Sequence, residues 1–212
     1  MWELVKAGGW LMLPLVICSI FTVAIAIERF IRLKKSNILP AGLLLSQGAG
    51  VKGVMQYLKQ NDSAQSSTLG RIFMAGYQNR QQPENYARAQ MEATASQEIG
   101  YLEKNINFLG TLSAVAPLLG LLGTVLGIIE SFLVIDLGTN SNPTLMIPGI
   151  SKALITTAAG MLIAIPALFA YRYFQRLVQE YIAELEQQST LFHAALFYQN
   201  DSVEEQEVKK AS

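Results

Sequence analysis

The chain has 212 residues, of which 51% are hydrophobic and 15% are charged, and its 16 Lys and Arg side chains balance 16 Asp and Glu side chains. A formal charge of zero argues against nucleic-acid binding, which normally needs a cationic excess. A soluble domain carries roughly 25% charged residues. The shortage of charged residues is therefore either distributed evenly, as in a soluble helical bundle, or concentrated in membrane spans. Long uncharged runs favour membrane spans.

The first uncharged run covers residues 7–27, which is 21 residues, and about 20 apolar residues of helix cross a bilayer. We predict a short periplasmic N-terminus at 1–8 and a transmembrane helix at 9–27. The small residues around Ala24-Ile25-Ala26 also resemble a signal-peptide cleavage pattern. Two features oppose that alternative. The run is longer than a signal-peptide core, and a cluster of positive charges follows the run and does not precede it: Arg29, Arg32, Lys34 and Lys35.

Residues 28–104 form a long polar segment with ten Lys/Arg and six Asp/Glu. The positive-inside rule places this segment in the cytoplasm. We predict one helix over Ala41–Gln60 and a second over Leu69–Arg80, with a break between them near Asn61. Pro83 is predicted at the first position of a further helix, which continues without a break into the membrane.

Two more apolar spans follow, at 105–135 and at 148–171, and Glu130 alone interrupts the first of them. The connection at 136–147 has no Lys or Arg and is predicted to be periplasmic. Residues 172–212 are predicted to form a cytoplasmic C-terminal helix with a frayed polar end. The predicted fold class is an all-α integral membrane protein with three transmembrane helices. The second and third helices extend into a cytoplasmic helical bundle, with the N-terminus outside and the C-terminus inside.

The sequence shows no pattern typical of an enzyme. Cys18 is the single cysteine, which excludes an internal disulfide and a cysteine-based zinc site. His193 is the single histidine, and packing or surface exposure competes with a switch or ligand role for it. We see no nucleophile paired with a base, no phosphate-binding loop and no metal-ligand cluster, and we expect no cofactor.

Small and hydroxyl-bearing residues form a stripe along one face of each of the last two spans. In the second span they are Ser113, Pro117, Gly120, Thr124, Gly127 and Ser131, with Ala116 and Gly123 alongside. In the third span they are Ala153, Thr157, Gly160, Ala164 and Ala167, with Thr156 alongside. Such a stripe is typical of close helix packing in lipid, and each threonine either bonds to its own helix or lines a polar path.

The apolar spans carry no titratable group between Asn105 and Ile129. A proton path normally needs such groups at depth, so conduction would need a partner's acid. Thr124 lies six residues from Glu130 and Thr157 lies five residues from Lys152. At 1.5 Å per residue, Glu130 and Lys152 are nearly level. They either pair between helices or subunits, or extend separately to water.

Two motifs resemble one family. Ala116–Ile129 (APLLGLLGTVLGII) resembles the second-helix signature of the ExbB/TolQ/MotA proton-channel subunits, and Gly149–Ala167 (GISKALITTAAGMLIAIPA) resembles their third-helix signature. Three spans and one large cytoplasmic loop look most like an ExbB-type biopolymer transport protein. The resemblance implies a homopentamer in the bacterial inner membrane around an ExbD/TolR-like single-span dimer, whose membrane aspartate carries the proton.

The resemblance also implies roles for particular residues. Thr124 and Thr157 match the pore threonines, with Thr156 beside them, and two prolines match the helix prolines: Pro117 and Pro166. The glycines and alanine expected to pack the pore helices are Gly120, Gly123, Gly127, Gly160 and Ala164. Lys152 departs from the pattern, because many relatives have glutamate there, and Glu130 is then a candidate for the missing acid.

The implied function is to use the proton motive force to energise outer-membrane transport, with a TonB-like protein as a further partner. A TolQ-type role in outer-membrane integrity and cell division is the alternative. Two further hypotheses are a non-conducting membrane scaffold and a channel made of this chain alone. The sequence names neither the outer-membrane target nor the cargo.

Overall fold

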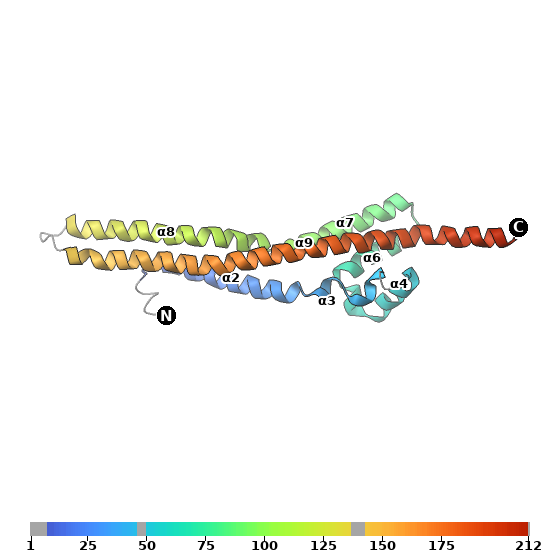
Figure 1. Ribbon diagram of the computed structural model, residues 1–212, viewed down its shortest axis with the longest axis horizontal. Coiled ribbons are helices and arrows are strands. Elements are labelled where there is room, and N and C mark those ends of the chain that lie inside the picture. The colour runs from blue at the N-terminus through green and yellow to red at the C-terminus, as the bar shows by residue number, and fades with distance from the viewer. Residues whose placement is uncertain (1–7, 46–49, 137–142, 212) are drawn as a thin grey trace. The chain divides into compact units, whose positions relative to one another are not determined.

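The computed structural model describes residues 8–45, 50–136 and 143–211. None of these residues is in a β-strand, so the predicted all-α class is confirmed (Figure 1). The elements in chain order are α2 (Met12–Arg32), α3 (Lys35–Ile38), η1 (Ala41–Leu43), α4 (Val51–Gln60), α5 (Asp62–Gln65), α6 (Thr68–Gln78), α7 (Glu84–Glu103), α8 (Ile106–Asp136), η3 (Pro143–Met146) and α9 (Ile147–Ala211).

The chain divides into two compact units. Unit 1 comprises Met1–Arg29 and Asn105–Phe174, and unit 2 comprises Phe30–Lys104 and Gln175–Ser212. Three helical stretches are long and apolar enough to cross a membrane: Met12–Arg32, Glu84–Leu133 and Thr144–Tyr198. Each overlaps one of the three predicted spans.

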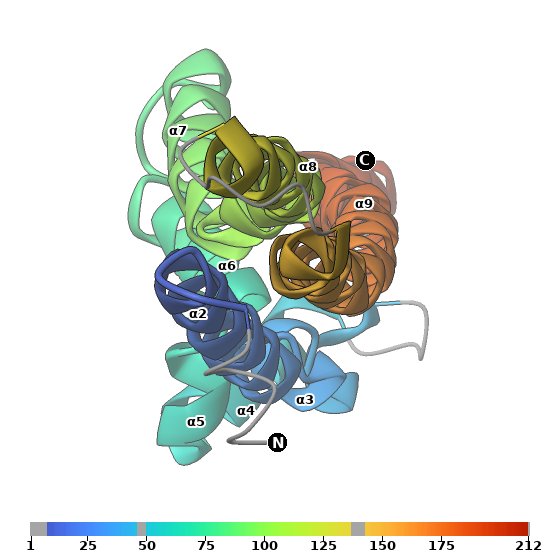
Figure 2. The same cartoon turned by 90° about the vertical axis from the view of Figure 1, so that its left-hand side faces the viewer.

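Unit 1 consists of α2, α8 and the first part of α9. Helix α8 and the first part of α9 run antiparallel and side by side, as the side view and the end-on view both show (Figures 1 and 2). Helix α2 packs against this pair through a cluster of Met12 and Leu15 with Ala116 and Ala164. Many large apolar side chains point outward; Leu162, for example, is 71% exposed. A lipid environment requires helices whose backbone N–H and C=O groups are hydrogen-bonded internally, with apolar side chains on the outside.

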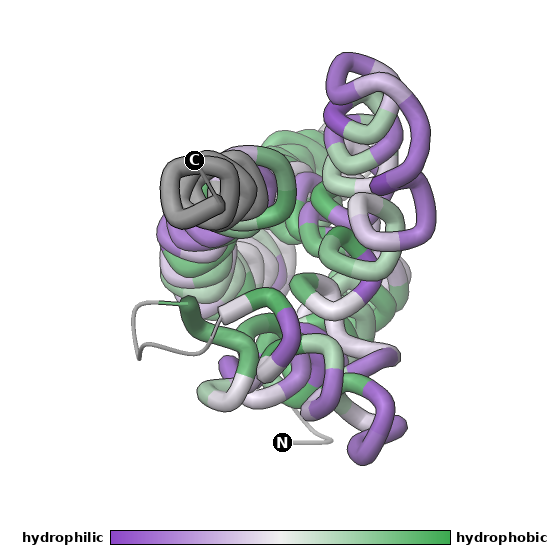
Figure 3. The backbone as a smooth tube through the Cα atoms, turned by 90° about the vertical axis from the view of Figure 1, so that its right-hand side faces the viewer, coloured by the Kyte–Doolittle hydropathy of each residue, from purple (hydrophilic) through white to green (hydrophobic). Residues whose placement is uncertain are grey.

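Unit 2 is a bundle of short helices packed on α7 and the later part of α9. Hydrophilic and hydrophobic residues alternate along its helices (Figure 3). The rings of Phe73 and Phe192 stack at 4.1 Å in its core, and the Tyr181 hydroxyl donates to the Leu33 carbonyl at 2.9 Å. Unit 2 therefore has a compact core to which several of its helices contribute side chains.

The helices of unit 2 differ in detail from the prediction. A single helix over Ala41–Gln60 is wrong, because a 3-10 turn at Ala41–Leu43 precedes a separate α4; residues 46–49 lie outside the described part of the chain. The predicted break near Asn61 contains the one-turn helix α5. Helix α6 begins one residue before the predicted range and ends two residues before its end, where the Asn79 side chain donates to the Ala75 carbonyl.

A continuous helix from Pro83 into the membrane is also wrong. Pro83 is the residue before the first turn of α7, with ψ 141°, so it is one position earlier than predicted. Helix α7 ends at Glu103, and Asn105 has φ 63°, in the left-handed region that asparagine tolerates better than most residues. The Asn105 amide donates to the Glu28 carboxylate at 3.1 Å, which stabilises this break.

Helix α9 continues to Ala211, where the sequence predicted a frayed end. Within unit 2 its His193 is largely buried, with 15% of the side chain exposed, and its Nε2 lies 3.8 Å from a Glu84 oxygen. His193 lines a groove of about 620 Å³ between α7 and α9. The single histidine is therefore a packed residue with a carboxylate close by.

Candidate functional site

The predicted site residues lie on α8 and on the first half of α9, in unit 1. Helix α8 contains Pro117 and α9 contains Pro166, and both helices continue past their prolines. A proline has no N–H, so each removes one hydrogen bond from its helix. Membrane helices tolerate this when neighbouring groups satisfy the freed carbonyl.

The small residues bring the backbones of α8 and α9 into contact. A β-carbon built on Gly160 would lie 2.6 Å from the Ala116 carbonyl oxygen, and one built on Gly127 would lie 2.7 Å from the Gly149 carbonyl oxygen. One built on Gly120 would lie 3.1 Å from the Thr157 α-carbon. Side chains at these positions would separate the helices, so the small residues are what permits the close approach.

The three threonines of the predicted pathway have different surroundings. Thr157 donates across the helix pair to the Gly120 carbonyl at 2.9 Å and is partly buried. Thr124 donates to the Leu121 carbonyl of its own helix at 2.6 Å and is half-buried. Thr156 is 1% exposed and donates to the Ala153 carbonyl at 2.9 Å. The structure brings Thr157 against α8, whereas Thr156 is enclosed by helix packing.

Gly123 and Ala164 also face the packed side of the helices. Gly123 leaves room for the Thr156 side chain, which a β-carbon at residue 123 would strike. Ala164 is 7% exposed and belongs to the cluster in which α2 packs on the pair. These two small residues therefore serve different contacts, one between α8 and α9 and one with α2.

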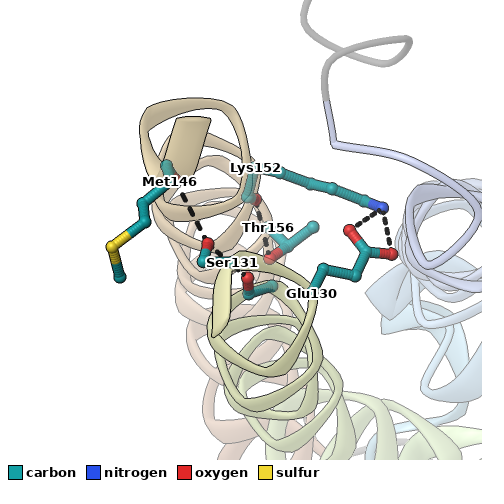
Figure 4. A network of polar contacts seen from close by, with 6 residues as sticks. Glu130, Ser131, Met146, Lys152 and Thr156 are labelled. Atoms are coloured by element: carbon teal, nitrogen blue, oxygen red, sulfur yellow. Dashed lines mark hydrogen bonds and ion pairs between the residues drawn. The ribbon is translucent and has the colours of Figure 1, made fainter. Parts of the chain in front are cut away.

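At one end of the helix pair, polar groups connect α8 to the start of α9 (Figure 4). Lys152 Nζ lies 2.9 Å from Glu130 Oε1 and 2.8 Å from Oε2, so the ammonium group contacts both carboxylate oxygens. The Ser131 hydroxyl donates to the Gly127 carbonyl at 2.9 Å and to the Met146 carbonyl at 3.2 Å. The two charges that the sequence places at similar depth are in direct contact.

Sequence reasoning did not assign site roles to Gly149 and Gly9. Gly149 lies four residues before Ala153, one turn beyond the stripe on the third span, and that spacing was an available signal. Gly9 has φ 70° and lies beneath the Lys152 side chain. No local pattern around residue 9 indicates a contact with residue 152, which is distant in the sequence.

Among the described residues there is no group of three or more metal-ligating side chains. The helix pair offers hydroxyls and backbone carbonyls at depth, and its charged groups, such as Glu130 and Lys152, lie toward its ends. This arrangement can pack closely and present polar oxygen atoms to a partner. It does not by itself supply a carboxylate at the level of Thr157.

The sequence profile of the MotA/TolQ/ExbB proton channel family matches residues 64–187. The chain belongs to this family. Helices α8 and the membrane part of α9 lie within the matched region, together with every predicted site residue. The protein is therefore a multi-pass membrane protein with an ExbB/TolQ-type proton-channel role.

Individual relatives agree with this assignment. The chain is 32% identical over 206 residues to an ExbB-like biopolymer transport protein of Synechocystis sp., covering 91% of this chain and 78% of the relative. It is 40% identical over 85 residues to the biopolymer transport protein ExbB of Salmonella typhimurium, covering 40% of this chain and 35% of the relative. It is 35% identical over 111 residues to the Tol-Pal system protein TolQ of Haemophilus influenzae, covering 50% of this chain and 49% of the relative.

Proposed function

We propose that this chain is an ExbB-type motor subunit of the bacterial inner membrane, which uses the proton motive force to energise transport across the outer membrane. The observation that carries the proposal is the α8–α9 pair, which is closely packed and has hydroxyls at depth but no titratable side chain between Asn105 and Ile129. A proton path built on these helices needs an acid from elsewhere. A single-span ExbD/TolR-like partner with a membrane aspartate would supply that acid.

In this proposal Thr124 and Thr157 lie along the proton route, beside the partner's aspartate. Their positions support the role in different ways: Thr157 bridges the two helices, and Thr124 lies half-buried on α8. Thr156 would act through packing, since it is enclosed. A proton that moves through 100 mV releases about 2.3 kcal/mol, which is the work available to turn or tilt the partner.

The proposed topology places the N-terminus in the periplasm and the C-terminus in the cytoplasm. The charges around the spans support it: residues 28–104 carry ten Lys/Arg, whereas residues 136–147 carry none. Unit 2 would then lie in the cytoplasm. The proposed assembly is a homopentamer around the partner dimer, with α8 and α9 toward the centre and a TonB-like protein as a further component.

Reconstitution tests the proposal. The purified chain is inserted into liposomes with and without the single-span protein that co-purifies with it, and proton flux is measured under an imposed potential. Flux that requires the partner, and that falls when the partner's membrane aspartate is changed to asparagine, is the expected result. Conduction by this chain alone would indicate a self-sufficient channel, and no flux with or without the partner would indicate a scaffold.

The second candidate is a TolQ-type role in envelope integrity, which the match to the Haemophilus influenzae protein supports. Deletion in the source organism separates the two. Loss of energy-dependent uptake across the outer membrane with normal detergent resistance supports the ExbB-type role. Detergent sensitivity and chained cells with normal uptake support the TolQ-type role.

A further inference from the structure

The ion pair between α8 and α9 has a third participant. Lys152 extends from the second turn of α9 to Glu130 near the end of α8, and both carboxylate oxygens lie within 2.9 Å of its Nζ. The Lys152 side chain is 28% exposed and that of Glu130 is 53% exposed. The lysine is therefore the more enclosed partner, and what encloses it includes the turn that precedes α2.

Gly9 is the residue of that turn which lies against the Lys152 side chain. A β-carbon at residue 9 would overlap the Lys152 ε-carbon and would lie 2.9 Å from Nζ. The backbone of Gly9 is in the left-handed region with φ 70°, and its carbonyl accepts the first turn hydrogen bond from the Met12 N–H at 3.1 Å. Any other residue would be strained here and would displace the lysine side chain.

The pair lies beside the contacts that set the register of α8 against α9. Next to Glu130, Ser131 donates at 3.2 Å to the carbonyl of Met146, the last residue of η3, directly before α9 begins. Five residues beyond Lys152, Thr157 donates to the Gly120 carbonyl at 2.9 Å. If α8 slid along α9 by one residue, its atoms would move by about 1.5 Å. A movement of that size would break these hydrogen bonds. A charged bridge at the end of the pair opposes such a slide.

We propose that Gly9, Glu130 and Lys152 form a positioning clasp, which holds the ends of α8 and α9 in the register that places Thr157 against Gly120. In the clasp Glu130 acts as the counter-charge of Lys152 and is not a proton carrier. What matters is one acid and one base across the two helices, and not which helix bears the acid. The inference rests on the proposed proton-channel function for its activity readout and on the structure alone for its stability readout.

Charge reversal tests the clasp. Glu130→Lys, Lys152→Glu and the double variant are reconstituted with the partner, and proton flux is measured across a pH series. Each single variant places two like charges opposite each other, so flux is expected to fall roughly three- to tenfold, which lies in the lower part of the range of coupling between contacting residues. The double variant restores the pair and is expected to recover to within about twofold of wild type, with an unchanged pH profile.

A reversed pair elsewhere is the matched control. Arg88 and Glu92 form an exposed i,i+4 pair on α7, with Nε 2.8 Å from Oε1. Reversal of Arg88 and Glu92, singly or together, is expected to leave flux unchanged. Failure of the Glu130→Lys/Lys152→Glu variant to recover, together with loss of flux in Glu130→Gln, would show that a carboxylate is needed at residue 130 itself and would overturn the clasp.

Gly9→Ala tests the third participant. It is expected to lower flux as much as Lys152→Met does, and the two changes together are expected to lower flux no further, because both release the same side chain. Additive losses would show that Gly9 acts independently of Lys152 and would remove it from the clasp.

Thermal unfolding of the same variants in detergent separates the clasp from the proposed function. If the wild-type complex conducts no protons, the proposed function fails, but the clasp still predicts that each single charge reversal lowers the unfolding temperature and that the double variant restores it. Equal unfolding temperatures for all four proteins would overturn the clasp whatever the flux shows.

Discussion

Replacement of Gly160 by alanine tests whether α8 and α9 must meet backbone to backbone. A β-carbon at residue 160 would lie 2.6 Å from the Ala116 carbonyl oxygen and 3.1 Å from the Gly120 α-carbon. Ordinary van der Waals contact begins at 3.4 Å, so the helices would have to separate locally by about 0.8 Å. Both neighbours are backbone atoms, which a change of rotamer cannot move.

Two opposing effects set the magnitude. Overpacking of a close contact costs about 1–3 kcal/mol, and alanine gains about 1 kcal/mol over glycine in helix propensity. The expected net loss of stability is therefore roughly 0–2 kcal/mol. For a chain of this length, each kcal/mol lowers the unfolding temperature by about 2–4 °C. The separation also lengthens the bond from Thr157 to Gly120, so proton flux is expected to fall.

The assay is thermal unfolding in detergent, followed by proton flux after reconstitution with the partner. Gly100→Ala in α7 is the control, because no atom outside the adjoining residues and the local helix backbone lies within 4 Å of the β-carbon position at Gly100. That variant should be more stable than wild type by about 0.4–1 kcal/mol. If Gly160→Ala proves as stable as Gly100→Ala and conducts normally, the close contact of backbones is not required and the reasoning fails.

Three further substitutions test single contacts. Thr157→Val keeps the shape but loses the hydroxyl that bonds to the α8 backbone; we expect flux to fall and stability to drop by about 0.6 kcal/mol, the average for hydrogen bonds between membrane helices. Arg71→Ala leaves the largely buried Glu98 carboxylate without its 2.9 Å ion-pair partner, and chemical denaturation should show a loss of about 1–2 kcal/mol. Asn105→Ala places alanine at φ 63°, where a residue with a β-carbon is strained. The unfolding temperature of this variant should fall by the equivalent of about 1–2 kcal/mol.

Each of these has a control in the same chain. Thr111 is exposed and donates within its own helix to the Asn107 carbonyl, so Thr111→Val should leave flux unchanged. Arg88→Ala removes an exposed ion pair and should change stability by no more than about 0.5 kcal/mol. Asn105→Gly accepts the positive φ and loses only the side-chain bond to Glu28, so it should be more stable than Asn105→Ala. The reverse order in any pair would contradict the contact assigned to it.

The membrane spans could be predicted from the sequence because the bilayer limits the solutions so strongly. A run of about 20 uncharged residues can satisfy its backbone in lipid only as a helix or in a closed barrel, and the residues 7–27 lack the alternation of a barrel strand. The stripes of small residues at helical spacing likewise indicated which faces of α8 and α9 pack together. In the structure Gly120, Gly127 and Gly160 lie at that contact.

The helix boundaries outside the membrane were less predictable. Residues 84–136 read as one long helix by local propensity, yet Asn105 breaks it with a positive φ. Glu28, which belongs to a different helix, accepts the Asn105 side-chain hydrogen bond and so stabilises the break. Local preference did not indicate this, because the stabilising group is far away in the sequence.

The sequence by itself therefore determined the class of the protein, the three apolar spans, the small-residue faces and the absence of a titratable group at depth, because each follows from composition and helical period. The tertiary structure decided where each polar group points. In the folded protein Thr157 donates to the Gly120 carbonyl, and Thr156 is buried. Lys152 lies against Gly9 and contacts Glu130. These contacts join residues on different elements, and their geometry exists only once the helices have packed.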